Sequence, residues 1–123
     1  MSDKPVILVV DDDKNTRDGL QRALQRHYDV KTAESADAAL AILDATPEVD
    51  VMLSDLRMPG TDGLGLLRRV NAQHPQTVSI LLTAYGSVET AVEAMKQGAY
   101  DFLTKPINLD HLDMLVARAI KSR

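Results

Sequence analysis

Residues 6–12 read VILVVDD, and the class of fold can be inferred outward from them. Five aliphatic residues follow one another without a polar break, which is typical of a strand covered on both faces, as in a parallel sheet. Similar runs stand at Val49–Leu53 and Val78–Leu82, with weaker ones at Asp29–Thr32 and Tyr100–Leu103. The sequence therefore predicts five strands.

Apolar residues recur at helical spacing after each of these runs, so a helix is expected to follow every strand. Segments 14–26 and 64–73 show this spacing less regularly than the other three. The apolar face of the segment that begins at Val88 is interpreted either as helix core or as a surface for a partner. The three regular faces are Ala36/Ala39/Leu40/Leu43, Val88/Ala91/Val92/Met95 and Leu112/Leu115/Val116/Ala119.

Capping residues stand where the predicted helices would begin and end. Ser35, Ser87 and Asn108 are favourable N-cap residues, and Gly98 stands where a C-terminal cap is expected. Five repeats of strand then helix, joined by right-handed crossovers, predict an α/β fold. We expect one five-stranded parallel sheet with helices on both faces.

Composition narrows the class of protein further. Residues 1–123 suit a single domain, 45% of them are hydrophobic, and cysteine is absent, which excludes disulfides and thiolate metal sites. The net charge of −4 comes without a basic block, so direct nucleic-acid binding is not expected. With neither a membrane-length apolar stretch nor a secretory signal, the sequence predicts a cytoplasmic protein without membrane contact.

Polar residues follow four of the five predicted strands directly. They are Asp11 and Asp12 after the first strand, Asp55 after the third, Thr83 after the fourth and Lys105 after the fifth. In doubly wound sheets, ligands bind beyond the carboxyl ends of the strands, so these side chains should share one site.

Each residue type suits phosphoryl transfer. Neighbouring carboxylates form the hard oxygen site that Mg²⁺ prefers, and one carboxylate can act as a nucleophile that forms an aspartyl-phosphate. Lysine and threonine can stabilise phosphoryl oxygens that gain charge during transfer. Taken singly, the triplet Asp11–Asp13 could be a solvated loop and Asp55 a turn residue. Their joint position at strand ends favours a site.

Other candidates carry no such chemistry. Gly60, Gly63 and Gly65 lack the spacing of a dinucleotide-binding loop and are interpreted as turn residues. The histidines show no metal-ligand spacing and are expected to be exposed. They are His27, His74 and His111.

Four segments together resemble the signature of response-regulator receiver domains: Val9–Asp12, Ser54–Gly60, Leu82–Ala84 and Leu103–Pro106. The resemblance covers essentially the whole chain and implies the flavodoxin-like (β/α)5 fold with strand order 2-1-3-4-5. It also implies a cis bond between Lys105 and Pro106.

Two longer runs, Leu82–Ala91 and Gly98–Leu103, are similar to the receivers of nitrogen-regulation-type activators. In that subfamily the receiver precedes a AAA+ ATPase and a helix-turn-helix domain. The resemblance therefore implies an output domain, in this chain or a separate one, that controls transcription.

The resemblance also assigns roles at the site. Asp55 would accept a phosphoryl group from a phosphohistidine on a sensor histidine kinase. Asp12, Asp55 and the backbone carbonyl of Arg57 would bind Mg²⁺, with Asp11 assisting directly or through water. The protein would be a phosphoacceptor switch rather than an enzyme.

A conformational response is implied by the same resemblance. Lys105 would contact the phosphoryl group, Thr83 would close on it, and Phe102 would occupy the position of the switch aromatic residue. The change would reach the surface formed by the fourth helix, fifth strand and fifth helix, within roughly residues 83–115. That surface could bind an output domain or a second copy of the chain.

Three other functions were weighed against this one. A phosphatase similar to the haloacid dehalogenase group would need a second acid two residues after the nucleophile, where Arg57 stands. A flavodoxin-like cofactor binder would need a Ser/Thr/Gly-rich loop after the first strand, where acids stand instead. A receiver-like module that is never phosphorylated usually lacks a key residue, and none is missing here.

Overall fold

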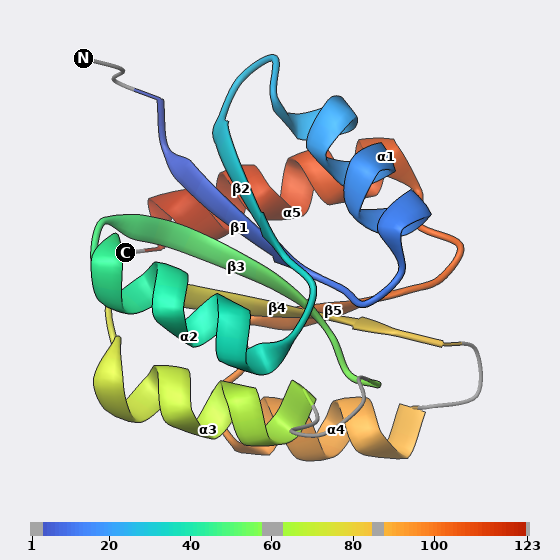
Figure 1. The fold of residues 1–123 in the computed structure, drawn as a ribbon. Coiled ribbons are helices and arrows are strands. Elements are labelled where there is room, and N and C mark those ends of the chain that lie inside the picture. The colour runs from blue at the N-terminus through green and yellow to red at the C-terminus, as the bar shows by residue number, and fades with distance from the viewer. Residues whose placement is uncertain (1–3, 58–62, 85–87, 123) are drawn as a thin grey trace.

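A five-stranded parallel sheet forms the centre of the computed structural model, which describes residues 4–57, 63–84 and 88–122 (Figure 1). The strand order β2-β1-β3-β4-β5 confirms the flavodoxin-like fold, with each strand followed by a helix. The strands are β1 Val6–Val10, β2 Asp29–Ala33, β3 Val49–Asp55, β4 Val78–Thr83 and β5 Asp101–Thr104. The helices are α1 Lys14–Leu24, α2 Ala36–Ala45, α3 Gly63–Gln73, α4 Val88–Lys96 and α5 Leu109–Lys121.

Helices α1 and α5 cover one face of the sheet, and α2, α3 and α4 cover the other (Figure 1). Because strand side chains alternate between faces, Ile7 and Val9 pack towards α1 and α5, whereas Leu8 and Val10 pack towards α2 and α3. Every residue of β1 is buried, which explains its unbroken aliphatic run.

Helix caps mostly follow the predictions. Ser35 accepts a hydrogen bond from the N–H of Ala38 at the start of α2, and Asn108 caps α5 in the same way. At the end of α4, Gly98 has a φ of 103°, the left-handed conformation that glycine adopts without strain. Ser87 lies outside the described residues.

The buried face of α4 differs from the prediction. Ala91 and Ala94 are buried, whereas Val92 and Met95 are 46% and 39% exposed. The side chain of Val88 lies outside the part that the structure describes. The small alanine side chains allow the helix to approach the sheet closely, and the larger apolar residues therefore face away from it. Of the two interpretations of this apolar face, the structure excludes helix core for Val92 and Met95.

Two glycines that were predicted to lie in turns are helical. Gly63 begins α3, and Gly65 lies within its first turn. A Cβ at Gly63 would stand 2.6 Å from both the carbonyl oxygen of Asp55 and the Cα of Leu56. Glycine is therefore required at position 63 by the close approach of α3 to the end of β3. It is not required there by a turn. Gly60 lies outside the described residues.

His74, which was expected to be exposed, is buried at the end of α3. Its Nε2 lies 2.9 Å from Oδ1 of Asp44 at the end of α2. The prediction was wrong because packing between α2 and α3 covers the imidazole, and the sequence distance between the two residues hides this pairing.

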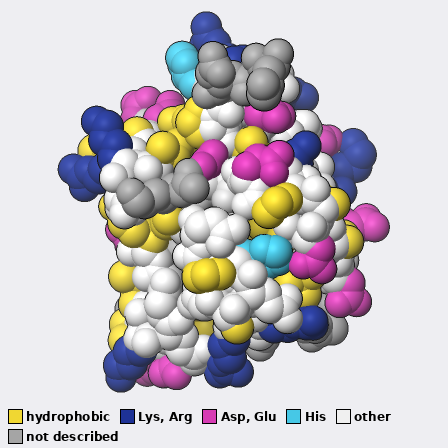
Figure 2. Space-filling view, turned by 90° about the vertical axis from the view of Figure 1, so that its left-hand side faces the viewer, with side chains coloured by type: hydrophobic (Ala, Val, Ile, Leu, Met, Phe, Trp, Pro, Cys, Tyr) yellow, Lys and Arg dark blue, Asp and Glu magenta, His cyan; other side chains and the backbone are white. Residues whose placement is uncertain are grey.

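Figure 2 shows the end of the molecule where the strands begin, opposite to the carboxyl ends of the strands. Lysine and arginine side chains lie mainly at its rim, and carboxylates stand between them. Among the helices of the described residues, none is both long enough and apolar enough to cross a membrane.

Candidate functional site

The carboxyl ends of β1, β3 and β5 bring together an ion-paired cluster. Lys105 Nζ donates hydrogen bonds to Oδ2 of Asp55 at 2.7 Å and to Oδ2 of Asp11 at 3.0 Å. These residues are far apart in the chain and meet because parallel strands end at the same edge of the sheet. Three of the residues predicted from strand ends therefore form one site.

Asp11 is fully buried, and its carboxylate is held on both oxygens. Oδ1 accepts the backbone N–H of Asp13 at 2.9 Å, while Oδ2 accepts from Lys105. Burial raises the pKa of Asp11, although the hydrogen bonds from Asp13 and Lys105 oppose it. For Lys105, burial lowers the pKa, but the hydrogen bonds to Asp55 and Asp11 outweigh it and leave the pKa above its ordinary value.

The arrangement of carboxylates suits a divalent cation. One oxygen from each of Asp11, Asp12 and Asp55 lies within 4.8 Å of the other two. Asp11 and Asp55 are buried, whereas Asp12 is exposed and can turn towards an ion from solvent. Hard carboxylate oxygens with room for water are the donors that Mg²⁺ prefers, so the residues present fit this ion.

The main chain around Asp55 is also ordered by hydrogen bonds. The N–H of Arg57 donates to Oδ1 of Asp55 at 2.9 Å, and the N–H of Leu56 donates to the carbonyl of Leu82 at 3.0 Å. The N–H of Gly63, at the start of α3, donates to the carbonyl of Leu56 at 3.0 Å. The Asp55 carboxylate is thus bound on one oxygen by the backbone and on the other by lysine.

Thr83 and Phe102 lie beside this cluster without joining it. Thr83 is buried at the end of β4, and its carbonyl accepts the N–H of Lys105 at 2.8 Å. Within the described residues, no hydrogen bond links the Thr83 hydroxyl to the carboxylates. Phe102 is half-buried against a small cluster that includes Leu56 and Leu81.

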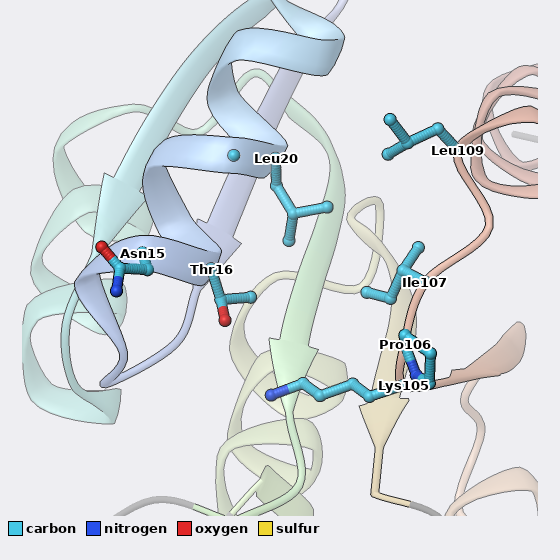
Figure 3. A pocket seen from close by; sticks show the side chains of 8 residues that line it. Asn15, Thr16, Leu20, Lys105, Pro106, Ile107 and Leu109 are labelled. Carbon is cyan, nitrogen blue, oxygen red and sulfur yellow. The ribbon is translucent and has the colours of Figure 1, made fainter.

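A groove of about 420 Å³ opens next to Lys105, between α1 and the loop after β5 (Figure 3). Leu20 projects from α1 on one side, and Ile107 and Leu109 line the other. The bond between Lys105 and Pro106 is cis, as predicted. The groove thus gives an apolar approach that ends at the charged cluster.

Sequence reasoning missed two features of the turn after β1. Asp13 caps α1, accepting from the N–H of Asn15 at 3.3 Å and the hydroxyl of Thr16 at 2.7 Å, and the bond from Thr16 lowers the pKa of Asp13. Arg17 Nη1 donates to the main-chain carbonyl of Asp11 at 2.7 Å. The available signal was an arginine four residues after an N-cap aspartate, one helical turn along.

Comparison with known proteins places these residues in context. Residues 7–117 match the family described as "Response regulator receiver domain". The chain is 42% identical over 117 residues to the response regulator protein PilR of Pseudomonas aeruginosa, which covers 94% of this chain and 26% of PilR. It is 44% identical over 116 residues to the DNA-binding transcriptional regulator NtrC of Salmonella typhimurium, covering 94% and 24% respectively.

Solved structures agree with this match. The crystal structure of the receiver domain of NtrX from Brucella abortus superimposes with a TM-score of 0.91 at 36% identity, covering 95% of this chain and 99% of that one. The chain spans about a quarter of the length of the curated relatives PilR and NtrC.

Proposed function

Since this chain belongs to the response regulator receiver domain family, with nitrogen-regulation-type regulators among its relatives, we propose that Asp55 is its phosphoacceptor. The observation that carries the proposal is the position of Lys105 Nζ, which bridges Asp55 and Asp11 at 2.7 and 3.0 Å. A cation held at the acceptor carboxylate can stabilise the charge of a transferred phosphoryl group.

The phosphoryl donor that fits is a phosphohistidine on a sensor histidine kinase. An oxygen of Asp55 attacks phosphorus, the phosphorus–nitrogen bond breaks, and the electron pair leaves with the imidazole, which takes up a proton. Lys105 then pairs with the phosphoryl oxygens instead of the free carboxylate. The groove beside Lys105 offers a place for the kinase to dock against α1. We further propose a cytoplasmic location for the protein.

We assign the metal site to Asp11, Asp12, Asp55 and the backbone carbonyl of Arg57. When bound there, Mg²⁺ would neutralise the clustered carboxylates and the incoming phosphoryl oxygens. Asp12 is the exposed member and suits direct coordination. Asp11 is completely buried, so we assign it an auxiliary role, directly or through water.

The proposed output is a change in the surface formed by α4, β5 and α5. Thr83 would move towards the phosphoryl group, and Phe102 would adjust in the space beside it, which biases a two-state equilibrium. The exposed Val92 and Met95 give that surface an apolar patch for a second copy or an output domain, and the regulated process would be transcription. Residues 1–123 would act as one receiver domain.

Phosphorylation by acetyl phosphate with Mg²⁺ tests the acceptor directly. Intact-protein mass spectrometry should detect one phosphoryl group on the wild type and on Asp37→Asn, a matched change on the exposed side of α2. Asp55→Asn should remain unlabelled because the amide is a poor nucleophile. Stoichiometric labelling of Asp55→Asn at another residue would contradict the assignment.

Thermal denaturation tests the metal site. An ion that binds only the native state adds about 2.7 kcal/mol of stability at 100 times its Kd. Millimolar Mg²⁺ should therefore raise the Tm of the wild type, and Asp12→Ala should lose most of this increase while remaining folded without metal. A wild-type Tm that ignores Mg²⁺ would exclude the site.

We propose a switch rather than a phosphatase, because the residue two positions after Asp55 is Arg57, not an acid that could act as a general acid and base. The protein should take up one phosphoryl group per chain from acetyl phosphate and should not hydrolyse p-nitrophenyl phosphate. Sustained turnover of that phosphomonoester would favour the phosphatase alternative.

A further inference from the structure

The turn between β1 and α1, which carries two of the three clustered carboxylates, is held to α1 by one guanidinium group. Arg17 Nη1 donates to the main-chain carbonyl of Asp11 at 2.7 Å. We propose that Arg17 is a positioning residue that sets this turn so that Asp11 and Asp12 face a common cation. The inference rests on the metal site of the proposed function and adds a residue that does not touch the ion.

The other hydrogen bonds of this turn involve different groups from the Asp11 carbonyl that Arg17 binds. The N–H of Asp11 donates to the carbonyl of Ala33 in β2 at 3.1 Å, which fixes the end of β1 against the sheet. The N–H of Asp13 binds the Asp11 carboxylate at 2.9 Å, which closes the turn locally. The Arg17 side chain reaches back from the first turns of α1 to the carbonyl on the other side of Asp11.

The exposed Asp12 depends on this anchoring more than Asp11 does. Asp11 is buried and bound by Lys105, so its carboxylate stays in place through its own contacts. Asp12 is the residue after the Asp11 carbonyl that Arg17 binds, so the main chain sets its position. Metal–ligand distances lie within about 0.2 Å of their preferred values, and loss of an outer hydrogen-bond partner commonly weakens metal affinity about 10–100-fold.

An open pocket beside Arg17 makes the role testable by chemical rescue. It has a volume of about 280 Å³ and is lined by Arg17, Thr32, Ala33, Glu34 and Ala38. Truncation of Arg17 would enlarge this pocket and leave the Asp11 carbonyl facing it. The exposed carboxylate of Glu34 would favour entry of a small cation such as ethylguanidinium.

The experiment measures the Kd of Mg²⁺ by calorimetry for the wild type, Arg17→Ala and Arg17→Lys. Arg22→Ala is the matched control, because it removes an exposed arginine from the same helix without touching the turn. Arg17→Ala should raise the Kd about tenfold, Arg17→Lys should lie between, and Arg22→Ala should match the wild type. All Kd values are taken well below the metal-free Tm, where a loss of stability alone leaves native-state affinity unchanged.

Rescue gives the second readout. Millimolar ethylguanidinium should lower the Kd of Arg17→Ala towards the wild-type value and speed its labelling by acetyl phosphate, whereas ethylammonium should do less. If Arg17→Ala does not fold, Arg17→Lys decides, since a wild-type Kd in that variant overturns the role. A wild type that binds no Mg²⁺ contradicts the proposed function itself, whereas normal binding by both Arg17 variants overturns the positioning role alone.

Discussion

Helices α5 and α4 lie on opposite faces of the sheet and are held to it in different ways (Figure 1). Helix α5 buries a full aliphatic stripe, whereas among the side chains of α4 that the structure describes, those of residues 89–96, Ala91 and Ala94 are buried and Val92 and Met95 are exposed. Full burial of one large aliphatic side chain is worth about 1.5–3 kcal/mol, so α5 is fixed far more firmly. The stripe of α5 comprises Leu112, Leu115, Val116 and Ala119.

Helix α4 is instead attached at its C-terminal end. The N–H of Ala99 donates to the carbonyl of Ala94 at 3.1 Å, and the N–H of Gly98 donates to the carbonyl of Met95 at 3.2 Å. This pair of hydrogen bonds is a Schellman motif. From α3, the side-chain amide of Asn71 donates to the carbonyl of Gln97 at 2.7 Å. The comparison indicates that α4 can be repositioned with little loss of packing, which suits the proposed switch surface.

Truncation of each helix gives the largest contrast. Leu112→Ala should lower the free energy of unfolding by about 2–5 kcal/mol because it leaves a cavity under α5. Met95→Ala should change it by less than about 0.5 kcal/mol, since the side chain is substantially exposed. Urea denaturation measures both values. Equal losses would show that α4 packs as deeply as α5.

Hydrogen exchange should separate the two helices without mutation. Amides of α4 should open at a free energy about 2 kcal/mol below those of α5, which corresponds to roughly 30-fold faster exchange. Addition of Mg²⁺ and beryllofluoride should then alter exchange in α4 more than in α5. Equal protection of the amides of α4 and α5 from exchange would contradict the inference that α5 is held more firmly than α4.

Loss of the C-terminal cap should weaken α4 specifically. Gly98→Ala should cost about 1–2 kcal/mol, because an L side chain is strained at a φ of 103° and its Cβ would lie 2.7 Å from the Asn71 amide nitrogen. Gly19→Ala is the control, since a Cβ there meets nothing within 4 Å. That change inside α1 should stabilise by about 0.5–1 kcal/mol. In urea denaturation, Gly98→Ala should therefore lower the free energy of unfolding and Gly19→Ala should raise it. Equal changes in the two variants would contradict the role of the cap.

The contrast also shows where sequence reasoning succeeds. Apolar spacing predicted the buried stripes of α2 and α5 because large aliphatic residues define one face of each. It failed on α4 for Val92 and Met95, which are exposed, whereas the smaller Ala91 and Ala94 are buried. Hydrophobicity alone does not reveal that a helix is set close to a sheet by small side chains.

At the site, strand ends predicted three residues that meet, but also Thr83, which does not join them. Asp11, Asp55 and Lys105 converge because parallel strands end at one edge, a property that follows from topology. The contact from Arg17 to the Asp11 carbonyl was missed, because the position of the arginine in the helix does not give the direction of its long side chain. The burial of His74 against Asp44 was missed because the two residues lie far apart in the sequence. Roles for Thr83, Phe102 and Arg57 stay predictions.

The smallest expected effect concerns one of the hydrogen bonds that join α3 to the residue after α4. Another is donated by Arg68 Nε to Oε1 of Gln97 at 2.6 Å. Asn71→Ala removes the donor to the Gln97 carbonyl and should cost about 1 kcal/mol, the usual net worth of one such bond. The loss should appear as faster exchange in the last turn of α4, while α5 stays unchanged. Asn15→Ala, an exposed change in α1, controls for the replacement of asparagine by a better helix former. If Asn71→Ala slows or leaves unchanged the exchange of α4, the hydrogen bond from Asn71 has no part in the contrast with α5.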